Sequence, residues 1–172
     1  PGECRMMHFP DKTDEKMKKL LYLALLLLPL GFMAASCSDD NDLPDVDVTV
    51  VYDNVVMENN VLYVVQGDIM KVTGIDCKGN DGKQALVNNV TYYLNGLPQI
   101  HPIFAPYGVG IDTGMLEPGR YVLTMGMNIL QVDKSISTGM IDQSFIVVKT
   151  AEELPDGATP GEVTRTIRFT PK

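Results

Sequence analysis

The sequence contains no tryptophan, no glycine-rich phosphate-binding loop, no internal repeat and no cluster of basic side chains. Its 22 Asp and Glu outnumber its 14 Lys and Arg, which gives a net charge of −8. Because an acidic surface repels a phosphate backbone, this balance argues against a nucleic-acid partner. The chain of 172 residues is long enough for one domain of ordinary size with its own core.

The stretch from residue 16 to residue 42 determines how the rest of the chain is interpreted. Three lysines around Met17 precede a leucine-rich run at 20–30, and Ala34, Ala35 and Ser36 lie directly before Cys37. A basic region, an apolar region and a small-residue cleavage site in this order are typical of a secretory signal peptide. The apolar run is shorter than the roughly 20 residues that a membrane span needs, so a cleaved signal is favoured over an uncleaved anchor helix.

The cysteine behind the small residues resembles the signal of bacterial lipoproteins, in which this cysteine carries lipid and becomes the first mature residue. Ala34 replaces the leucine that is usual three positions earlier, so the lipobox is a relaxed one. The next residues resemble the export signal of surface lipoproteins of certain gut-type Gram-negative anaerobes: Ser38, Asp39, Asp40, Asn41 and Asp42. Such a short charged segment is also typical of a solvated tether. The resemblance implies a lipid anchor at Cys37 and a place on the cell surface, in the outer membrane.

Few residues remain for chemistry after such a cleavage. Cys77 would have no cysteine partner, which excludes a disulfide framework. His101 would be the single histidine of the mature chain, so a zinc site would lack enough histidine and cysteine ligands. Cys77 and His101 form the one conceivable thiol–imidazole pair, and no motif surrounds either residue. The remaining carboxylates fall singly on strands and in turns, so no acid–base pair stands out. We therefore expect no enzyme, no cofactor and no metal.

A calcium site in one loop is an alternative that the sequence leaves open. Residues 76–82 include Asp76, Asn80 and Asp81, whose oxygen atoms suit a hard cation. The spacing does not match the EF-hand pattern, and Asp, Asn and Gly are ordinary turn residues. Cys77, at the start of this loop, is expected to be a half-buried small apolar residue.

From Val46 onward the apolar residues recur with period two. Val46, Val48 and Val50 alternate with Asp47 and Thr49, which predicts a half-buried strand. Further strands are expected at residues 61–65, 69–75, 90–94, 100–104, 107–111, 121–129 and 141–149. Asn95-Gly96 is a strong hairpin signal, and no segment after Cys37 has a helical period. These patterns predict an all-β sandwich.

The segment Leu116-Glu117-Pro118-Gly119-Arg120-Tyr121 is similar to the L-x-P-G-x-Y corner of fibronectin type III and immunoglobulin-like domains. The resemblance implies that Leu116 fills the core, that Pro118 and Gly119 set the turn, and that the Tyr121 hydroxyl bonds back to the main chain. The segments 92–96, 111–113 and 65–68 also resemble bacterial Ig-like domains. Together they imply an immunoglobulin-like β-sandwich of about seven strands, which says little about function.

The expected organisation has four parts. Residues 1–36 are upstream residues and the signal peptide, 37–45 are an acidic tether, 46–149 are the Ig-like sandwich, and 150–172 are a linker with a possible extra edge strand. In this last part, residues 164–169 alternate and predict either an added strand or a contact with a partner.

Four aromatic residues near the Asn95-Gly96 hairpin form a candidate ligand patch: Tyr92, Tyr93, Phe104 and Tyr107. Because neighbours on a strand face opposite sides, one of Tyr92 and Tyr93 is expected in the core.

The favoured function is a lipid-anchored, non-catalytic binding or adhesion module, or an accessory subunit of an outer-membrane assembly. Its edge strands offer β-augmentation to a protein partner. The alternative is a glycan-binding surface lipoprotein similar in role to accessory proteins of polysaccharide-utilisation systems, against which the absence of tryptophan weighs. A hydrolase would require a cleft with two close carboxylates.

Overall fold

The period-two pattern that follows Val46 forms the first strand, β1 (Val46–Glu58). The computed structural model describes residues 43–170. In β1, Val46, Val48 and Val50 are fully buried, while Asp47 and Thr49 between them are not. Each buried valine contributes about 1.5–3 kcal/mol by leaving water, so the alternation itself positions the strand. The predicted half-buried strand is confirmed.

The structure has these further strands: β2 (Val61–Val65), β3 (Ile69–Gly79), β4 (Ala85–Leu94), β5 (Leu97–Ile100), β6 (Val109–Asp112), β7 (Gly119–Gln131), β8 (Ser137–Val148) and β9 (Gly161–Phe169). Short 3₁₀ turns lie at η3 (Thr113–Met115), η4 (Ala151–Glu153) and η5 (Pro155–Gly157). Within residues 43–170, no helix is long and apolar enough to cross a membrane. The all-β fold class is confirmed.

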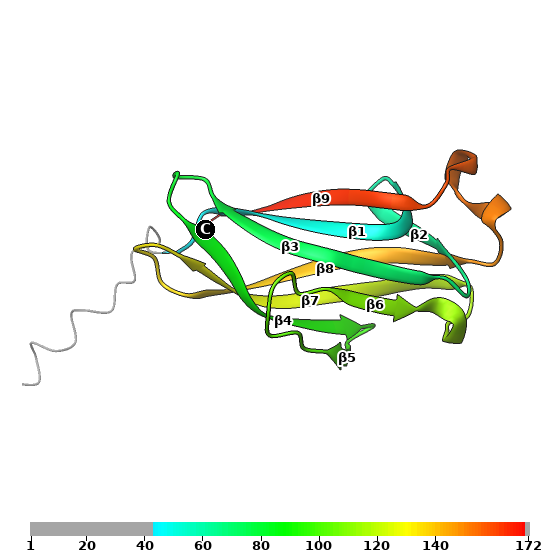
Figure 1. Ribbon diagram of the computed structural model, residues 1–172, viewed down its shortest axis with the longest axis horizontal. Helices are drawn as coiled ribbons and strands as arrows, with labels where there is room; N and C mark the ends of the chain where they lie inside the picture. The colour runs from blue at the N-terminus through cyan, green and yellow to red at the C-terminus, as the bar shows by residue number, and fades with distance from the viewer. Residues whose placement is uncertain (1–42, 171–172) are drawn as a thin grey trace, which may run out of the picture. The chain divides into compact units, whose positions relative to one another are not determined.

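The strands form two sheets, joined through β1 (Figure 1). One sheet has the order β9-β1-β3-β6 and the other the order β2-β8-β7-β4-β5. The order agrees with an immunoglobulin sandwich in which β1, β3 and β6 take the places of strands A, B and E, and β4, β7 and β8 those of C, F and G. The predicted immunoglobulin-like β-sandwich is confirmed, with nine strands in the described chain where about seven were expected.

Two of the strands extend the usual pattern. Strand β2 pairs parallel to β8, and β9 pairs antiparallel to β1, from Val46 opposite Phe169 to Val55 opposite Gly161. The strand expected at residues 164–169 is therefore present and begins at Gly161. Arg165 of β9 also reaches the other sheet, where its guanidinium donates to the Gln143 Oε1 atom at 2.7 Å.

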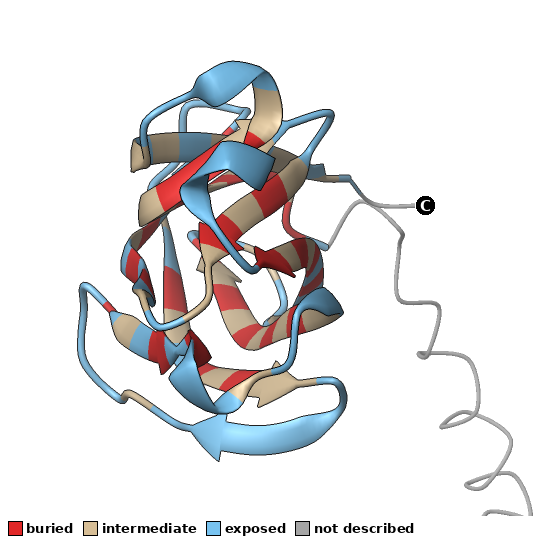
Figure 2. Cartoon of the chain, turned by 90° about the vertical axis from the view of Figure 1, so that its right-hand side faces the viewer, coloured by how far each residue is buried: buried red, intermediate tan, exposed pale blue. Residues whose placement is uncertain are grey.

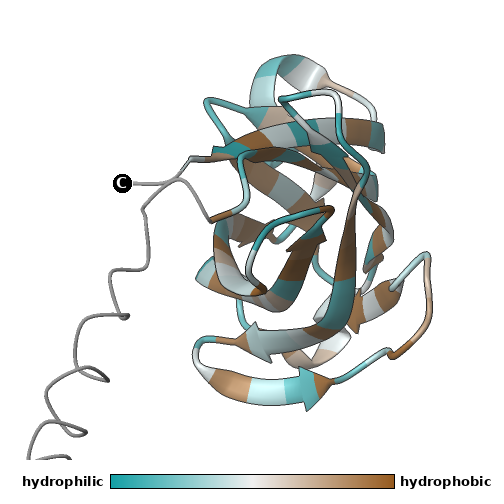
Figure 3. Ribbon diagram, turned by 90° about the vertical axis from the view of Figure 1, so that its left-hand side faces the viewer, coloured by the Kyte–Doolittle hydropathy of each residue, from teal (hydrophilic) through white to brown (hydrophobic). Residues whose placement is uncertain are grey.

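The core lies between the two sheets, and buried and exposed residues alternate along the strands (Figure 2). The same alternation appears in the hydropathy of the strands (Figure 3). The largest fully buried side chains include Tyr52, Tyr92, Phe145, Leu62, Met70 and Leu123. The Tyr92 hydroxyl donates to the Tyr107 carbonyl at 2.6 Å. The Tyr52 hydroxyl is buried and has no hydrogen-bond partner among the described residues.

The predicted tyrosine corner is present between η3 and β7. The Tyr121 hydroxyl donates to the Glu117 carbonyl at 2.8 Å, and the Tyr121 ring stacks on Phe145 with centroids 5.4 Å apart. Leu116 is partly buried against the core, as the resemblance implied, and Pro118 lies in the turn before Gly119, the first residue of β7. These residues are therefore structural.

Several sequence-based boundaries were wrong. The strands expected to begin at residues 90 and 141 begin at Ala85 and Ser137, and three further differences have a local reason. The loop expected at residues 76–82 starts later, because Cys77 is buried opposite Val48 and extends β3 to Gly79. The strand expected at residues 100–104 lies earlier in the chain, as β5 (Leu97–Ile100), and ends before Pro102. The strand expected at 107–111 begins only at Val109, because Tyr107 has a φ of 61°, outside the strand region.

Candidate functional site

The two outer faces of the sandwich differ in charge. The outer face of the β9-β1-β3-β6 sheet carries charged side chains. They include Lys71 and Asp53, which form a salt bridge at 3.5 Å, and Asp47, which lies opposite Arg168. Arg120 lies at an outward position near the start of β7, but the outward positions over the middle of β4, β7 and β8 are almost all uncharged: Asn88, Thr91, Tyr93, Thr124, Gly126, Asn128, Thr138, Met140 and Asp142. The acid in this set, Asp142, accepts a hydrogen bond from the Thr124 hydroxyl at 2.6 Å. We call these nine positions the neutral face.

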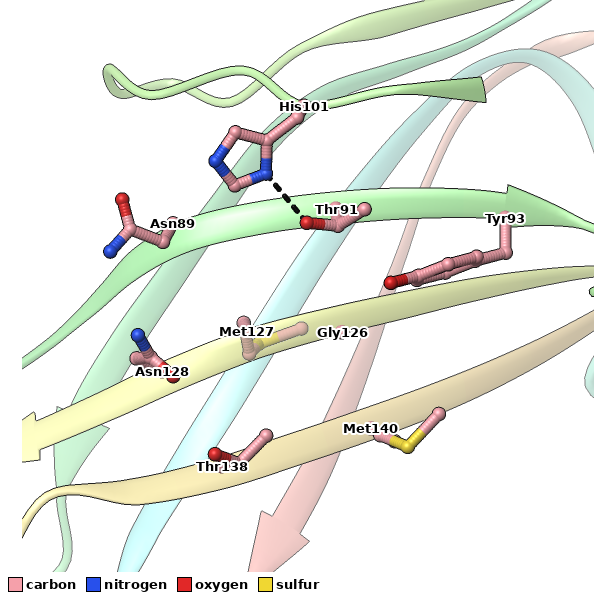
Figure 4. A pocket seen from close by; sticks show the side chains of 9 residues that line it. All are labelled: Asn89, Thr91, Tyr93, His101, Gly126, Met127, Asn128, Thr138 and Met140. Atoms are coloured by element: carbon pink, nitrogen blue, oxygen red, sulfur yellow. Dashed lines mark hydrogen bonds between the residues drawn. The ribbon is translucent and has the colours of Figure 1, made fainter. Parts of the chain in front are cut away.

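A hollow of about 330 Å³ lies in the middle of the neutral face, and Figure 4 shows the residues that line it: Asn89, Thr91, Tyr93, His101, Gly126, Met127, Asn128, Thr138 and Met140. Gly126 of β7 pairs with Thr91 of β4 on one side and with Met140 of β8 on the other, so it forms the floor. Pockets for small ligands usually measure roughly 300–1,000 Å³, so this hollow is large enough for a single small group.

Polar side chains surround this floor. The His101 Nδ1 atom lies 2.6 Å from the Thr91 hydroxyl oxygen, which holds the imidazole over β4 (Figure 4). Asn89 is the extra residue of a β-bulge in β4 and has a φ of 53°, so the bulge turns its side chain toward the hollow. Within residues 43–170, the side chains of Asn89, Asn128 and Thr138 make no hydrogen bond. Their donors and acceptors are therefore available to a ligand.

The fold does not require glycine at position 126. A Cβ atom added there would lie 3.7 Å from Tyr93 Cε2 and 4.0 Å from the Thr91 carbonyl oxygen, which are ordinary contacts. At Gly139 on the neighbouring strand, by contrast, a Cβ atom would lie 2.8 Å from Ile129 Cδ1 and 3.1 Å from Phe169 Cε1. Side-chain packing therefore explains why position 139 is glycine, but it does not explain why position 126 is glycine. Glycine inside a strand often marks a place where a ligand approaches the backbone closely.

The structure separates the four aromatic residues of the predicted patch. Tyr92 is buried and Tyr93 is not, which confirms that one of these two neighbours lies in the core. Tyr107 is buried as well, and its hydroxyl donates to the Val87 carbonyl at 2.9 Å. The predicted patch is therefore wrong for Tyr92 and Tyr107. Inside the core each of these two hydroxyls has a carbonyl partner, which offsets the cost of burying it. Phe104 is 78% exposed on the loop after β5 and does not line the hollow. Of the four, only Tyr93 lies in the hollow.

The structure gives no support to a thiol–imidazole pair of Cys77 and His101. Cys77 is buried, and burial raises the pKa of its thiol to about 11, with Asp76 and Asp47 adding to the effect. Its thiol is therefore protonated at neutral pH and is a poor nucleophile. His101 is instead engaged with Thr91.

Local hydrogen bonds engage the side chains of Asp76, Asn80 and Asp81, the candidate calcium ligands. The Asp76 carboxylate accepts from the Cys77 amide at 2.9 Å, and the Asn80 amide donates to Asp45 at 2.8 Å. The backbone N–H of Lys83, followed by the side-chain amide of Gln131, holds the pKa of Asp81 below its usual range. Among the described residues, no three His, Cys, Asp or Glu side chains gather as metal ligands.

The lipidation site Cys37 and the export segment, Ser38, Asp39, Asp40, Asn41 and Asp42, lie outside the described residues. Both therefore remain predictions.

One sequence signal would have pointed to the neutral face. No Asp, Glu, Lys or Arg occurs from residue 84 to residue 111, a run of 28 residues, or from 121 to 132, a run of 12. In a chain with 21% charged residues, these runs mark β4, β5 and β7 as strands with uncharged residues on both sides. Gly126 lies within the second uncharged run, at a position that faces outward.

Comparison with known proteins adds little to this description. No family model and no curated protein matches the chain. Among solved structures, the chain is similar to the fibronectin(III)-like modules of Clostridium thermocellum CbhA, with 13% sequence identity and a TM-score of 0.34. The match covers 58% of this chain and 97% of that chain. A likeness this weak carries no functional argument, so the fold assignment rests on the strand order and the candidate site on its own geometry.

Proposed function

We propose that this chain is a non-catalytic binding domain of the bacterial cell envelope. Lipid on Cys37 would hold it to the outer membrane with the domain exposed at the cell surface, and the neutral face would bind the ligand. The observation that carries the binding proposal is the hollow at Gly126, which is lined by the side chains of Asn89, Asn128 and Thr138, none of which makes a hydrogen bond within residues 43–170. The order of lysines, leucines, small residues and cysteine supports the anchor.

The chemistry of the hollow favours binding over catalysis. General acid–base catalysis needs two positioned groups that exchange protons with the substrate. Among the lining residues, the His101 imidazole is the one common acid–base group, and its Nδ1 atom lies 2.6 Å from the Thr91 hydroxyl oxygen. Asp142 lies on the same face but outside the hollow. The site therefore has groups that hold a ligand and no pair that would transform one.

A second candidate function is assembly with another protein through the strand edges. A groove between β5 and β6, of about 340 Å³, is lined in part by Ile100, Val109, Ile111 and Met115. Leu97 and Ile100 of β5 are 68% and 48% exposed, and Met115 is 89% exposed. Since β5 and β6 are the edges of their sheets, an extended segment of a partner could pair with either.

Site-specific photo-crosslinking on intact cells tests the binding face. Thr138 is replaced by p-benzoylphenylalanine on the neutral face, and Lys78, exposed on the opposite outer face, is replaced as the matched control. We expect an adduct of higher mass from position 138 and none from 78. Equal adducts from both positions, or none from either, would contradict a binding role for the neutral face. An adduct from Ile100 alone would favour the edge-strand assembly.

The anchor has its own test. The full chain and its Cys37→Ala variant are expressed in a Gram-negative host with a labelled fatty acid. We expect label in the full chain, loss of label in the variant, and cleavage of the full chain by protease added to intact cells. Label that persists in the variant contradicts an anchor at Cys37, and a protected protein contradicts surface exposure.

A further inference from the structure

The hollow on the neutral face also indicates the chemical class of its ligand. We propose that it binds a neutral carbohydrate, with one sugar ring seated over Gly126 beside the ring of Tyr93. This inference rests on the proposed function, because it names the ligand of the same site.

The first argument is the shape of the hollow. In Figure 4 the Tyr93 ring is seen edge-on, parallel to the strands, with Gly126 and Met140 on one side of it. The Tyr93 Cε2 atom lies 3.7 Å from the position that a Cβ atom would take at Gly126, so the ring stands directly beside this glycine. A ring-shaped ligand can therefore stand on the floor with one face against the Tyr93 ring, an aromatic wall that loses little freedom on binding. A sugar ring has such a face, made of C–H groups.

The second argument is the set of polar groups around the floor. A sugar presents hydroxyls, each of which donates and accepts hydrogen bonds. The amides of Asn89 and Asn128 and the hydroxyl of Thr138 each offer both functions, and none of them is used within residues 43–170. Buried polar groups of a ligand cost free energy unless they are paired, so a hydroxyl-rich ring matches this lining better than an apolar one.

The third argument is the absence of full charges from the lining. No Asp, Glu, Lys or Arg lines the hollow, so an ionised sugar or a phosphate would lose water without gaining a counter-ion. The site therefore favours neutral sugars.

An extended peptide fits this site less well than a ring. Peptides that bind sheets usually do so by pairing with a free strand edge. Strand β7 under the hollow is already paired with β4 on one side and β8 on the other, and Gly126 takes part in both ladders. The backbone below the ligand therefore offers no hydrogen bonds, and recognition depends on the side chains around the floor.

A shallow site with one aromatic wall binds a single ring weakly, with a Kd on the order of 1 mM. Many lipid-anchored copies on one surface would bind a polymer far more tightly, because each further contact is intramolecular. The site therefore suits a polysaccharide with a repeated neutral unit.

Isothermal titration of the purified full chain with oligosaccharides tests the inference. The probes are maltoheptaose, xylohexaose, mannohexaose and the acidic control oligogalacturonate. We expect at least one neutral probe to bind and the acidic probe not to bind. Tyr93→Ala should weaken the affinity at least ten-fold, Tyr93→Phe should keep most of it because the ring remains, and Gly126→Val should abolish it by filling the floor. Thr73→Ala, exposed on the other outer face, serves as the matched control and should bind like the parent chain.

Three results would overturn the inference. They are the absence of binding to every neutral probe, binding only to oligogalacturonate, and unchanged binding by Gly126→Val or Tyr93→Ala when circular dichroism shows them folded. Photo-crosslinking separates this failure from that of the proposed function. Adducts from position 138 without sugar binding would leave the binding face in place and make its ligand something other than a neutral carbohydrate.

Discussion

Replacing Gly126 with alanine is expected to raise the free energy of unfolding by about 1 kcal/mol. Glycine in a strand costs roughly 0.5–1 kcal/mol relative to alanine, because the unfolded chain has more freedom to lose. The new methyl group meets Tyr93 Cε2 at 3.7 Å and the Thr91 carbonyl oxygen at 4.0 Å, so it adds contact without a clash. Partial burial of one methyl group contributes a further few tenths of a kcal/mol, at about 0.8 kcal/mol for a fully buried group.

Gly139→Ala is the matched control, because the two glycines lie one residue apart in the ladder between β7 and β8. Gly126 pairs with Met140, and Met127 pairs with Gly139. A Cβ atom at position 139 would lie 2.8 Å from Ile129 Cδ1 and 3.1 Å from Phe169 Cε1, which forces both side chains to move. Overpacking of this kind usually costs about 1–3 kcal/mol, so this variant should be less stable than the parent chain.

Urea unfolding of the three proteins, followed by circular dichroism, measures both effects. We expect the midpoint to rise for Gly126→Ala and to fall for Gly139→Ala, with slopes unchanged because the same surface is exposed on unfolding. In thermal unfolding, 1 kcal/mol corresponds to about 2–5 °C for a domain of this size. A loss of more than about 1 kcal/mol in Gly126→Ala would refute the reasoning, since the glycine would then serve the fold and the hollow would need no ligand to explain it.

The buried polar groups give three further predictions. Tyr52→Phe should leave the free energy of unfolding unchanged or raise it by up to about 1 kcal/mol, because the lost hydroxyl has no partner in the described chain. Tyr107→Phe should lower it by about 1–2 kcal/mol, because the buried Val87 carbonyl loses its donor. The Cys77 thiol should resist thiol reagents at pH 8 until the protein unfolds, because burial raises its pKa to about 11. Stability should also fall as the pH rises from the ordinary pKa of 9.0 through about 11, and Cys77→Ala should reduce that fall.

Each of these predictions has a contrary outcome. Equal losses in Tyr52→Phe and Tyr107→Phe, by urea unfolding at pH 7, would show that both hydroxyls are paired in solution. Rapid labelling of folded Cys77 would show that its strand opens often. For the alkaline series, the unfolded thiol ionises first, so the folded state loses relative stability as the pH rises. An unchanged slope in Cys77→Ala would assign that loss to other groups.

The fold was largely predictable because its signals are local. The alternation of Val46, Val48 and Val50 depends only on the two-residue period of a strand, and the Asn95-Gly96 turn depends only on backbone preferences at two positions. In the structure these two turn residues have φ values of 47° and 80°, as such a hairpin turn needs. The Tyr121 corner is equally local, since its hydroxyl bonds a carbonyl four residues back.

The uncharged runs indicate the neutral face, but the hollow on it was not predictable, because it depends on non-local pairing and on one bulge. The hollow brings together side chains from β4, β7, β8 and the loop after β5. The bulge at Asn89 shifts the alternation in β4 by one residue, which places Tyr92 in the core and Tyr93 outside. Strict alternation from Val87 would give the opposite assignment. The spacing of residues in the sequence does not predict this β-bulge.

The position of β1 between β3 and β9 has a mechanical consequence. Tension applied at Leu43 along the axis of β1 loads the backbone hydrogen bonds to both neighbouring strands at the same time, since β1 runs antiparallel to each. Bonds loaded together in shear yield at a higher force than bonds opened one after another. Strand β9, which ends beside Val46, doubles the number of neighbours that share this load. Under the proposed anchor at Cys37, a pull on a bound ligand would load β1 first, and its bonds to both neighbouring strands would resist that pull together.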